Sequence, residues 1–157
     1  MDTQQFSSRI MEMEGTLHSV ARTFFASPHD CADAVQEAVL KAWQGRHTLR
    51  NDAYFGTWVV RILMNQCKSM YRQRARQVPV AQVPEASGVP QPDLALRDAV
   101  MGLDLLYRLP FVLHYVEGYS TQEIAGILRV PKGTILSRLH RARKQLGHVL
   151  SEEARPS

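Results

Sequence analysis

The stretch 119–145 constrains the fold most strongly, because it has the pattern of two short helices joined by a tight turn. Ser120 precedes Glu123 by three residues, which is the spacing of a capping box at a helix start. Apolar residues follow at helical spacing, and Pro131 is expected to end that helix because proline disfavours the helical conformation of the residue before it. Gly133 permits a close turn. The pattern predicts a helix-turn-helix, a motif whose second helix enters a DNA groove.

The second helix of this segment is expected to begin with Thr134 as its cap and to bury one apolar face. That face consists of Ile135, Leu139, Ala142 and Leu146. Between residues 129 and 144 there are six Arg or Lys and no Asp or Glu. A surface helix normally interleaves both signs, so the acid-free run predicts contact with a polyanion. The alternative is a solvated helix whose cations favour the negative end of its dipole.

A second basic stretch lies upstream, at 61–76, and it also lacks acids. Its cations are Arg61, Lys68, Arg72, Arg74 and Arg76. The net charge of the whole chain is only +4, so the distribution is more informative than the total. Two separate basic stretches predict two contacts with a polyanion.

The chain has 157 residues, of which 45% are hydrophobic, enough for one ordinary domain or two small ones. Residues 77–92 contain four of the eight prolines and no regular apolar period, which predicts an extended linker. We therefore expect an N-terminal part at 1–76, a C-terminal part at 93–150 and a tail at 151–157. The linker also leads us to expect that the two parts move independently in the free protein.

The expected fold class is all-α. In the N-terminal part, apolar periodicity predicts helices near 4–26, 30–44 and 52–76, which can form a three-helix bundle. In the C-terminal part it predicts helices near 94–106 and 107–117, followed by the two helices of the helix-turn-helix. These four helices are expected to enclose a small core of their own.

The sequence contains no signature of an enzyme. Its six histidines are dispersed, there is no HExxH pattern or glycine-rich phosphate loop, and Cys31 and Cys67 form no CxxC pair. We therefore expect no catalytic residues, no metal and no cofactor. The chain lacks both the roughly 18 consecutive apolar residues of a membrane span and a secretory signal pattern. A reduced, cytoplasmic protein is the default expectation.

Three segments in one order carry a family resemblance: DAVQEAVLKAW (33–43), FGTWVVRILMNQCKSMYRQR (55–74) and EGYSTQEIAGILRVPKGTILSRLHRARKQL (117–146). They resemble sigma regions 2 and 4 of the extracytoplasmic-function (ECF) type sigma factors, bacterial subunits that direct RNA polymerase to selected promoters. The resemblance implies three partners, namely core RNA polymerase, promoter DNA and an inhibitory anti-sigma factor.

The helix at 30–44 resembles the segment that docks on the clamp helices of the polymerase β′ subunit, and the β flap is a further implied polymerase contact. The implied docking positions are Asp33, Gln36, Glu37 and Leu40. Without the resemblance, Asp33 and Glu37 would be interpreted as a solvated acidic face near a helix start, which the helix dipole favours.

The helix at 52–76, with the loop at 46–54, resembles the part that opens and holds the −10 promoter element. A melted strand needs a cationic groove and surfaces on which unstacked bases can lie. The implied DNA-binding residues are Tyr54, Arg61, Asn65, Lys68, Tyr71, Arg72 and Arg74. Phe55 and Trp58, at helical spacing, are instead expected mainly in the core.

The second helix of the helix-turn-helix resembles the element that recognises the −35 duplex. The implied contacts are Lys132, Thr134, Ser137, Arg138, His140, Arg141, Arg143 and Lys144. Arginine recognises guanine edges in the major groove, so Arg138 and Arg141 are expected to select sequence. Arg143 and Lys144 are expected to contact phosphates, which positions the helix without selecting sequence.

Two other functions remain open at the level of sequence. The first is a stand-alone helix-turn-helix regulator whose N-terminal helices form a sensor or dimerisation domain. The second is a structural adaptor that binds another protein through those helices. The regulator hypothesis leaves the second basic stretch and its neighbouring aromatic residues without a role.

Overall fold

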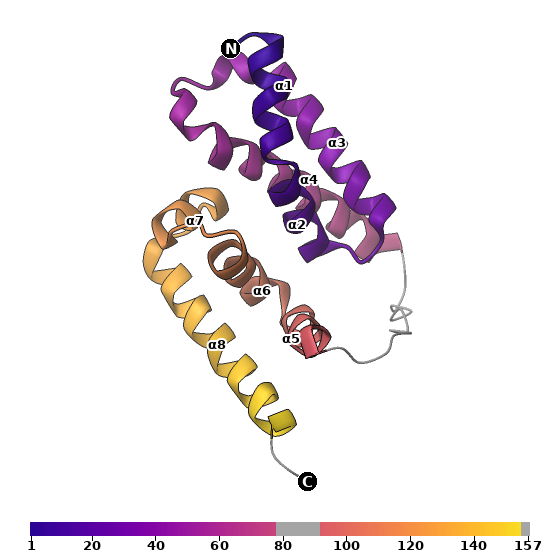
Figure 1. The fold of residues 1–157 in the computed structure, drawn as a ribbon, viewed down its shortest axis with the longest axis vertical. Coiled ribbons are helices and arrows are strands. Elements are labelled where there is room, and N and C mark those ends of the chain that lie inside the picture. Colours follow the sequence, from indigo (N-terminus) through magenta and orange to yellow (C-terminus); the bar gives the residue numbers. More distant parts are fainter. Residues whose placement is uncertain (78–91, 155–157) are drawn as a thin grey trace.

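The computed structural model describes residues 1–77 and 92–154, and the side chains of residues 1–76 and 95–148. Within those ranges all regular elements are helical and no strand is present, which confirms the all-α prediction. In Figure 1 the N-terminal half lies above the C-terminal half, with α6 and α8 below α2 and α4, and with α7 below the start of α4 and to the left of α2.

The N-terminal half contains four helices, which are α1 (Thr3–Glu12), α2 (Glu14–Phe24), α3 (Pro28–Gln44) and α4 (Phe55–Gln77). Short 3₁₀ turns at Arg46–Thr48 and Asp52–Tyr54 join α3 to α4. The single helix expected at 4–26 is thus divided, because Met13 both ends α1 and begins α2. Gly15, a poor helix former, lies two residues further on. The apolar spacing continues across this bend, so periodicity could not reveal it.

The C-terminal half contains α5 (Pro92–Met101), α6 (Leu105–Phe111), the π-helical turn η3 (Val112–Val116), α7 (Thr121–Leu128) and α8 (Lys132–Ala154). Pro110 lies in α6 just before the π turn. Proline has no amide N–H to donate, and its ring crowds the preceding turn of the helix. In the π turn that follows, the backbone hydrogen bonds join residues five apart instead of four. The amide of Glu117 donates to the carbonyl of Val112, five residues earlier, at 3.0 Å.

The predicted boundaries differ from the observed elements at both ends of the C-terminal half. The expected linker at 77–92 lies outside the described residues except for its two ends, which belong to α4 and α5. The expected tail at 151–157 is helical as far as Ala154, because α8 continues into it.

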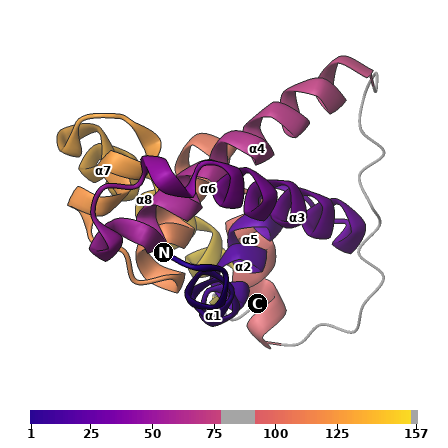
Figure 2. The ribbon, with the colours of Figure 1, turned by 90° about the horizontal axis from the view of Figure 1, so that it is seen from above.

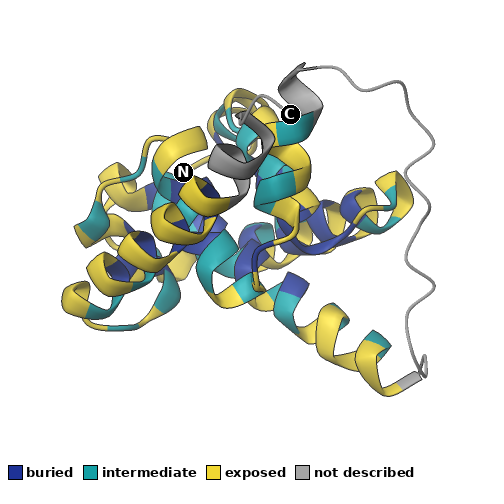
Figure 3. Cartoon of the chain, turned by 90° about the horizontal axis from the view of Figure 1, so that it is seen from below, coloured by how far each residue is buried: buried dark blue, intermediate teal, exposed yellow. Residues whose placement is uncertain are grey.

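One apolar core joins the two halves, whereas the sequence suggested a small core in each. α4 packs against α2 and α3, and on its other side it contacts α7, while α6 packs against α2. Val59 and Leu63 of α4 belong to the same buried cluster as Leu113 of η3 and Ile124 of α7. Figures 2 and 3 show this arrangement, with buried residues gathered where the helices meet and the exposed last turns of α4 projecting outward.

A smaller cluster lies within the C-terminal half, between α8 and the chain around α5 and α6. It consists of the buried residues Leu103, Ala142 and Leu146, with Tyr107 and Phe111 packed against them. This cluster fixes α6 along one flank of α8.

Candidate nucleic-acid interface

The helix-turn-helix forms as predicted, with one correction at the turn. The Ser120 amide donates to the Glu123 carboxylate and the Glu123 amide donates to the Ser120 hydroxyl, both at 3.1 Å, which confirms the capping box. α7 ends at Leu128 and is capped by Arg129, the only non-glycine residue with positive φ (57°) in the described ranges. Gly133 does not make the turn, and Thr134 is not a cap, because α8 already begins at Lys132. A left-handed residue at a helix end is usually glycine or asparagine, so the left-handed conformation of Arg129 could not be predicted from its residue type.

The face of α8 opposite the core is exposed and cationic. Ile135, Leu139, Ala142 and Leu146 are all buried, as expected. The residues proposed to contact the −35 element lie around the rest of the helix, outside this buried face. Lys132, Ser137, His140, Arg141, Arg143 and Lys144 are exposed, whereas Thr134 and Arg138 are half-buried.

α4 carries a polar stripe along the side that faces the C-terminal half. Its members are Arg61, Asn65, Lys68 and Arg72, at spacings of four, three and four residues, which places them on one face of a helix. Two aromatic residues lie close to this stripe in sequence. Tyr54, in the loop before α4, is 64% exposed, and Tyr71 is 41% exposed, so both rings are accessible. Phe55 is buried and Trp58 half-buried, which confirms their expected core role.

Part of this stripe is covered by the C-terminal half. Arg61 donates through Nη2 to the backbone carbonyl of Gly126 in α7, at 2.7 Å. Lys68 lines a cleft of about 350 Å³ together with Arg72 and Arg138, over an apolar floor from α6 and α7. Burial lowers the pKa of Lys68, and the neighbouring charges of Arg72 and Arg138 lower it further. Residues expected at the −10 and −35 elements therefore face each other across one cleft.

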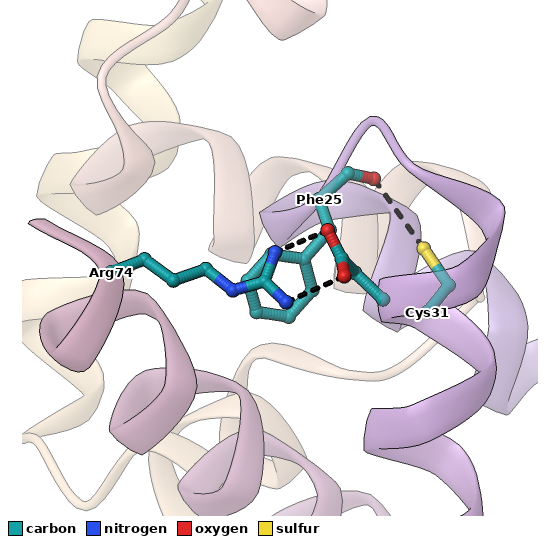
Figure 4. A network of polar contacts seen from close by, with 4 residues as sticks. Phe25, Cys31 and Arg74 are labelled. Atoms are coloured by element: carbon teal, nitrogen blue, oxygen red, sulfur yellow. Dashed lines mark hydrogen bonds and ion pairs between the residues drawn. The ribbon is translucent and has the colours of Figure 1, made fainter. Parts of the chain in front are cut away.

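Arg74 does not belong to the stripe, although the sequence placed it among the −10 residues. It continues the buried side of α4 and forms a two-pronged ion pair with Asp30 at the start of α3. Its guanidinium also lies over the ring of Phe25, 5.2 Å from the ring centre (Figure 4). The hydrogen bond from Arg74 lowers the pKa of Asp30. The spacing of Leu63, Cys67 and Arg74 along the buried side of α4 is the sequence signal that could have separated Arg74 from the stripe.

The predicted docking residues share one exposed face of α3. Asp33, Gln36, Glu37 and Leu40 follow the i, i+3, i+4, i+7 spacing of a single helical face, and all four are exposed. Leu40 is 48% exposed at the end of this acidic face. An exposed leucine beside acids is a suitable contact for a partner protein with an apolar and basic surface.

Two tyrosines that the sequence did not single out contact the arginines of α8. Tyr107 of α6 accepts a hydrogen bond from Arg141 at 3.1 Å, and Tyr115 of η3 accepts one from Arg143 at 2.7 Å. The two tyrosines are separated from these arginines by 34 and 28 residues, so no local pattern could connect them.

The described residues are also informative about three other features, namely a membrane span, a metal site and a disulfide. Among the described residues, no helix is both long and apolar enough to cross a membrane, and no three His, Cys, Asp or Glu side chains are grouped as metal ligands would be. Cys31 and Cys67 are buried and unbonded to each other, and burial raises the pKa of the Cys67 thiol to about 12.

Comparison with known families covers both halves of the chain. Residues 10–77 match the model of Sigma-70 region 2, and residues 93–146 match that of Sigma-70 region 4. The ECF RNA polymerase sigma factor SigM of Mycobacterium tuberculosis is 33% identical over 155 residues, which span 95% of this chain and 79% of SigM. The chain belongs to the ECF family of RNA polymerase sigma factors.

A further sequence relative and two solved structures are also similar to this sigma factor. The ECF RNA polymerase sigma-E factor of Escherichia coli is 28% identical over 92% of this sigma factor and 86% of its own length. Bartonella quintana RpoE, solved in complex with the anti-sigma factor NepR, aligns with a TM-score of 0.80 at 25% identity over 95% of this chain and 98% of its own. CnrH, solved with the cytosolic domain of CnrY, aligns with a TM-score of 0.76 at 25% identity over 98% of this chain and 92% of its own.

Proposed function

We propose that this sigma factor initiates transcription by binding core RNA polymerase and directing it to promoters that carry specific −10 and −35 elements. The observation that carries the proposal is the presence of regions 2 and 4, in order, on one chain. A stand-alone regulator is not favoured, because residues 10–77 match region 2 rather than a sensor domain. Catalysis would belong to the polymerase, and the site of action would be the cytoplasm.

In this proposal the two halves of the chain have different binding roles. The N-terminal part, 1–76, docks on the β′ clamp helices through the exposed face of α3 and holds the melted −10 strand along α4. Its proposed DNA contacts are Tyr54, Arg61, Asn65, Lys68, Tyr71 and Arg72, while Arg74 positions α4 against α3. The C-terminal part, 93–150, contacts the β flap and recognises the −35 duplex through α8.

The proposed regulator is an anti-sigma factor. Support comes from the overall likeness to RpoE, solved with NepR, and to CnrH, solved with part of CnrY. Both alignments cover nearly the whole chain, so the arrangement of the two halves resembles those solved in the two complexes. An anti-sigma factor that holds this arrangement would keep Arg61, which is bonded to α7, and Lys68, which lines the cleft, from DNA.

The docking face is tested by measuring affinity for core RNA polymerase. Leu40→Asp should weaken binding about tenfold or more, because it removes an apolar side chain from the contact and places a charge there. Met11→Asp is the matched control, since Met11 is 73% exposed on α1, away from the proposed face, and its replacement should leave the affinity unchanged. Equal affinities of the Leu40→Asp variant and the wild type would show that α3 does not dock on polymerase.

A further inference from the structure

We infer that Tyr107 and Tyr115 form a bracket that holds two arginines in place on opposite flanks of α8 for recognition of the −35 duplex. The inference rests on the proposed function, and it deepens that function by adding two positioning residues that lie outside the recognition helix. Tyr107 belongs to α6 and Tyr115 to the π turn that follows it.

The bracket follows from the geometry of α8. Arg141 and Arg143 are two residues apart, so their side chains leave the helix roughly 200° apart around its axis. Each guanidinium donates to a different tyrosine hydroxyl, at 3.1 Å for Arg141 and 2.7 Å for Arg143. The exposed residues Ser137, His140 and Lys144 lie on the face between these two flanks.

Both tyrosine rings pack against neighbouring side chains, which restricts the positions of their hydroxyls, although Tyr115 is 48% exposed. The ring of Tyr107 packs against the small cluster formed by Leu103, Ala142 and Leu146. The ring of Tyr115 lies 4.8 Å from the ring centres of both Phe111 and His114. The imidazole of His114 is itself held at 2.7 Å from the carbonyl of Tyr119. An exposed arginine side chain loses considerable rotamer freedom when it binds DNA. A hydrogen bond that already restricts the side chain in the free protein reduces this entropy cost of binding.

The hydrogen bond to tyrosine leaves each arginine able to bind DNA. A guanidinium has five N–H donors, and Arg141 uses one of them on Tyr107, so a bidentate contact to a guanine edge remains possible. Arg143, held further round the helix and nearer the core-facing side, is better placed for a phosphate at the groove wall. The bracket thus assigns sequence selection to the Tyr107 flank and general affinity to the Tyr115 flank.

The test replaces each tyrosine by phenylalanine, which removes the hydroxyl and keeps the ring. Holoenzyme formed from the full chain and core RNA polymerase is used to select from promoter fragments with a randomised −35 element, and the affinity for selected and mismatched sequences is then measured. Tyr107→Phe should reduce the discrimination against single-base changes roughly two- to tenfold, the expected effect of one lost hydrogen bond. Tyr115→Phe should weaken all sequences by a similar factor and reduce the salt dependence of binding.

Double mutants separate positioning from a merely structural role. Tyr107→Phe should have no further effect on discrimination in an Arg141→Ala background, and Tyr115→Phe should have no further effect on affinity in an Arg143→Ala background. If each tyrosine change has the same effect with and without its arginine, or if it leaves −35 preference and affinity unchanged, the bracket is wrong. A wild-type holoenzyme that selects a −35 element would in that case still support the proposed function. A wild-type holoenzyme that selects none would overturn both.

Discussion

At the scale of single residues, the cations of this sigma factor have three different environments. Arg61 donates to a backbone carbonyl of the other half, Arg74 pairs with an acid in its own half, and Arg141 and Arg143 donate to tyrosines. Sequence shows only that these residues are basic. What each cation can do depends on the partner that it already has, because a donor occupied in the folded protein must be released or shared before it binds DNA.

The pair of Arg74 with Asp30 should stabilise the fold and contribute little to DNA binding. Arg74→Gln and Asp30→Asn should each lower the free energy of unfolding, with a coupling of about 0.2–1 kcal/mol in the double mutant, since the pair is partly exposed. Urea unfolding of the four proteins measures this coupling. Because the pair lowers the pKa of Asp30, its stabilisation is fully present above the ordinary aspartate pKa and is lost as the pH falls from there through the lowered pKa of the folded protein.

Arg76→Gln is the control for this prediction, because Arg76 lies two residues after Arg74 on α4, is exposed, and forms no ion pair with the residues that the structure describes. Arg74→Gln should also leave the salt dependence of promoter binding at its wild-type slope. One lost phosphate contact on duplex DNA should reduce the slope of log affinity against log salt concentration by about 0.9. If Arg74→Gln reduces the slope by this amount and shows no coupling to Asp30, Arg74 contacts DNA after all.

At the scale of helices and turns, features that depend on neighbouring residues were easier to predict from the sequence than features that depend on distant contacts. The capping box at Ser120 and the buried face of α8 were predictable because each depends on residues within one or two turns of each other. The i, i+3, i+4, i+7 face of α3 was predictable for the same reason. The proposal that this face docks on polymerase rests on the family resemblance and not on the pattern.

The features that sequence did not reveal involve backbone conformation or distant contacts. The left-handed conformation of Arg129 and the division of α1 from α2 arise at residues whose types are compatible with a continuous helix. The π turn after Pro110 changes the direction in which Tyr115 leaves the chain, and the result is a contact with Arg143, 28 residues away. Such contacts depend on how helices pack, which apolar periodicity does not specify.

At the scale of the whole molecule, the two halves are packed together in a form that covers part of the surface proposed to hold the −10 element. Arg61 is bonded to α7, and its Nε is buried without a hydrogen-bond partner within the described part of the chain, which is unfavourable. Lys68, Arg72 and Arg138 place three like charges around one cleft. Separation of the halves would relieve both costs and would expose the stripe to DNA.

We therefore expect the halves to separate when the sigma factor binds core polymerase. Dyes attached at Ser7→Cys and Gln145→Cys, both exposed positions, would report the distance by energy transfer. The native thiols should not interfere, because Cys31 and Cys67 are buried and burial raises the pKa of both. The free protein should show a short distance and the polymerase-bound protein a longer one.

Arg61→Ala should shift the free protein toward longer distances, because it removes the hydrogen bond to Gly126. Arg50→Ala, an exposed arginine in the loop before α4, is the control and should leave the distance distribution unchanged. The same distance in the free, polymerase-bound and Arg61→Ala forms would mean that the packed arrangement is the working one. A short, narrow distance distribution in the free wild-type protein would contradict the expectation, drawn from the linker, that the halves move independently when free.

The central claim, that this chain directs RNA polymerase to promoters, is tested most directly by reconstituted transcription. Core RNA polymerase is mixed with genomic DNA fragments, with and without the sigma factor, and the 5′ ends of the transcripts are mapped. We expect a small set of defined start sites that appear only when the sigma factor is present, each preceded by a shared −10 and −35 element. The sigma factor alone should bind the same duplexes weakly. Tight, specific binding of the protein alone to duplex DNA, with no start sites added in the presence of polymerase, would contradict it.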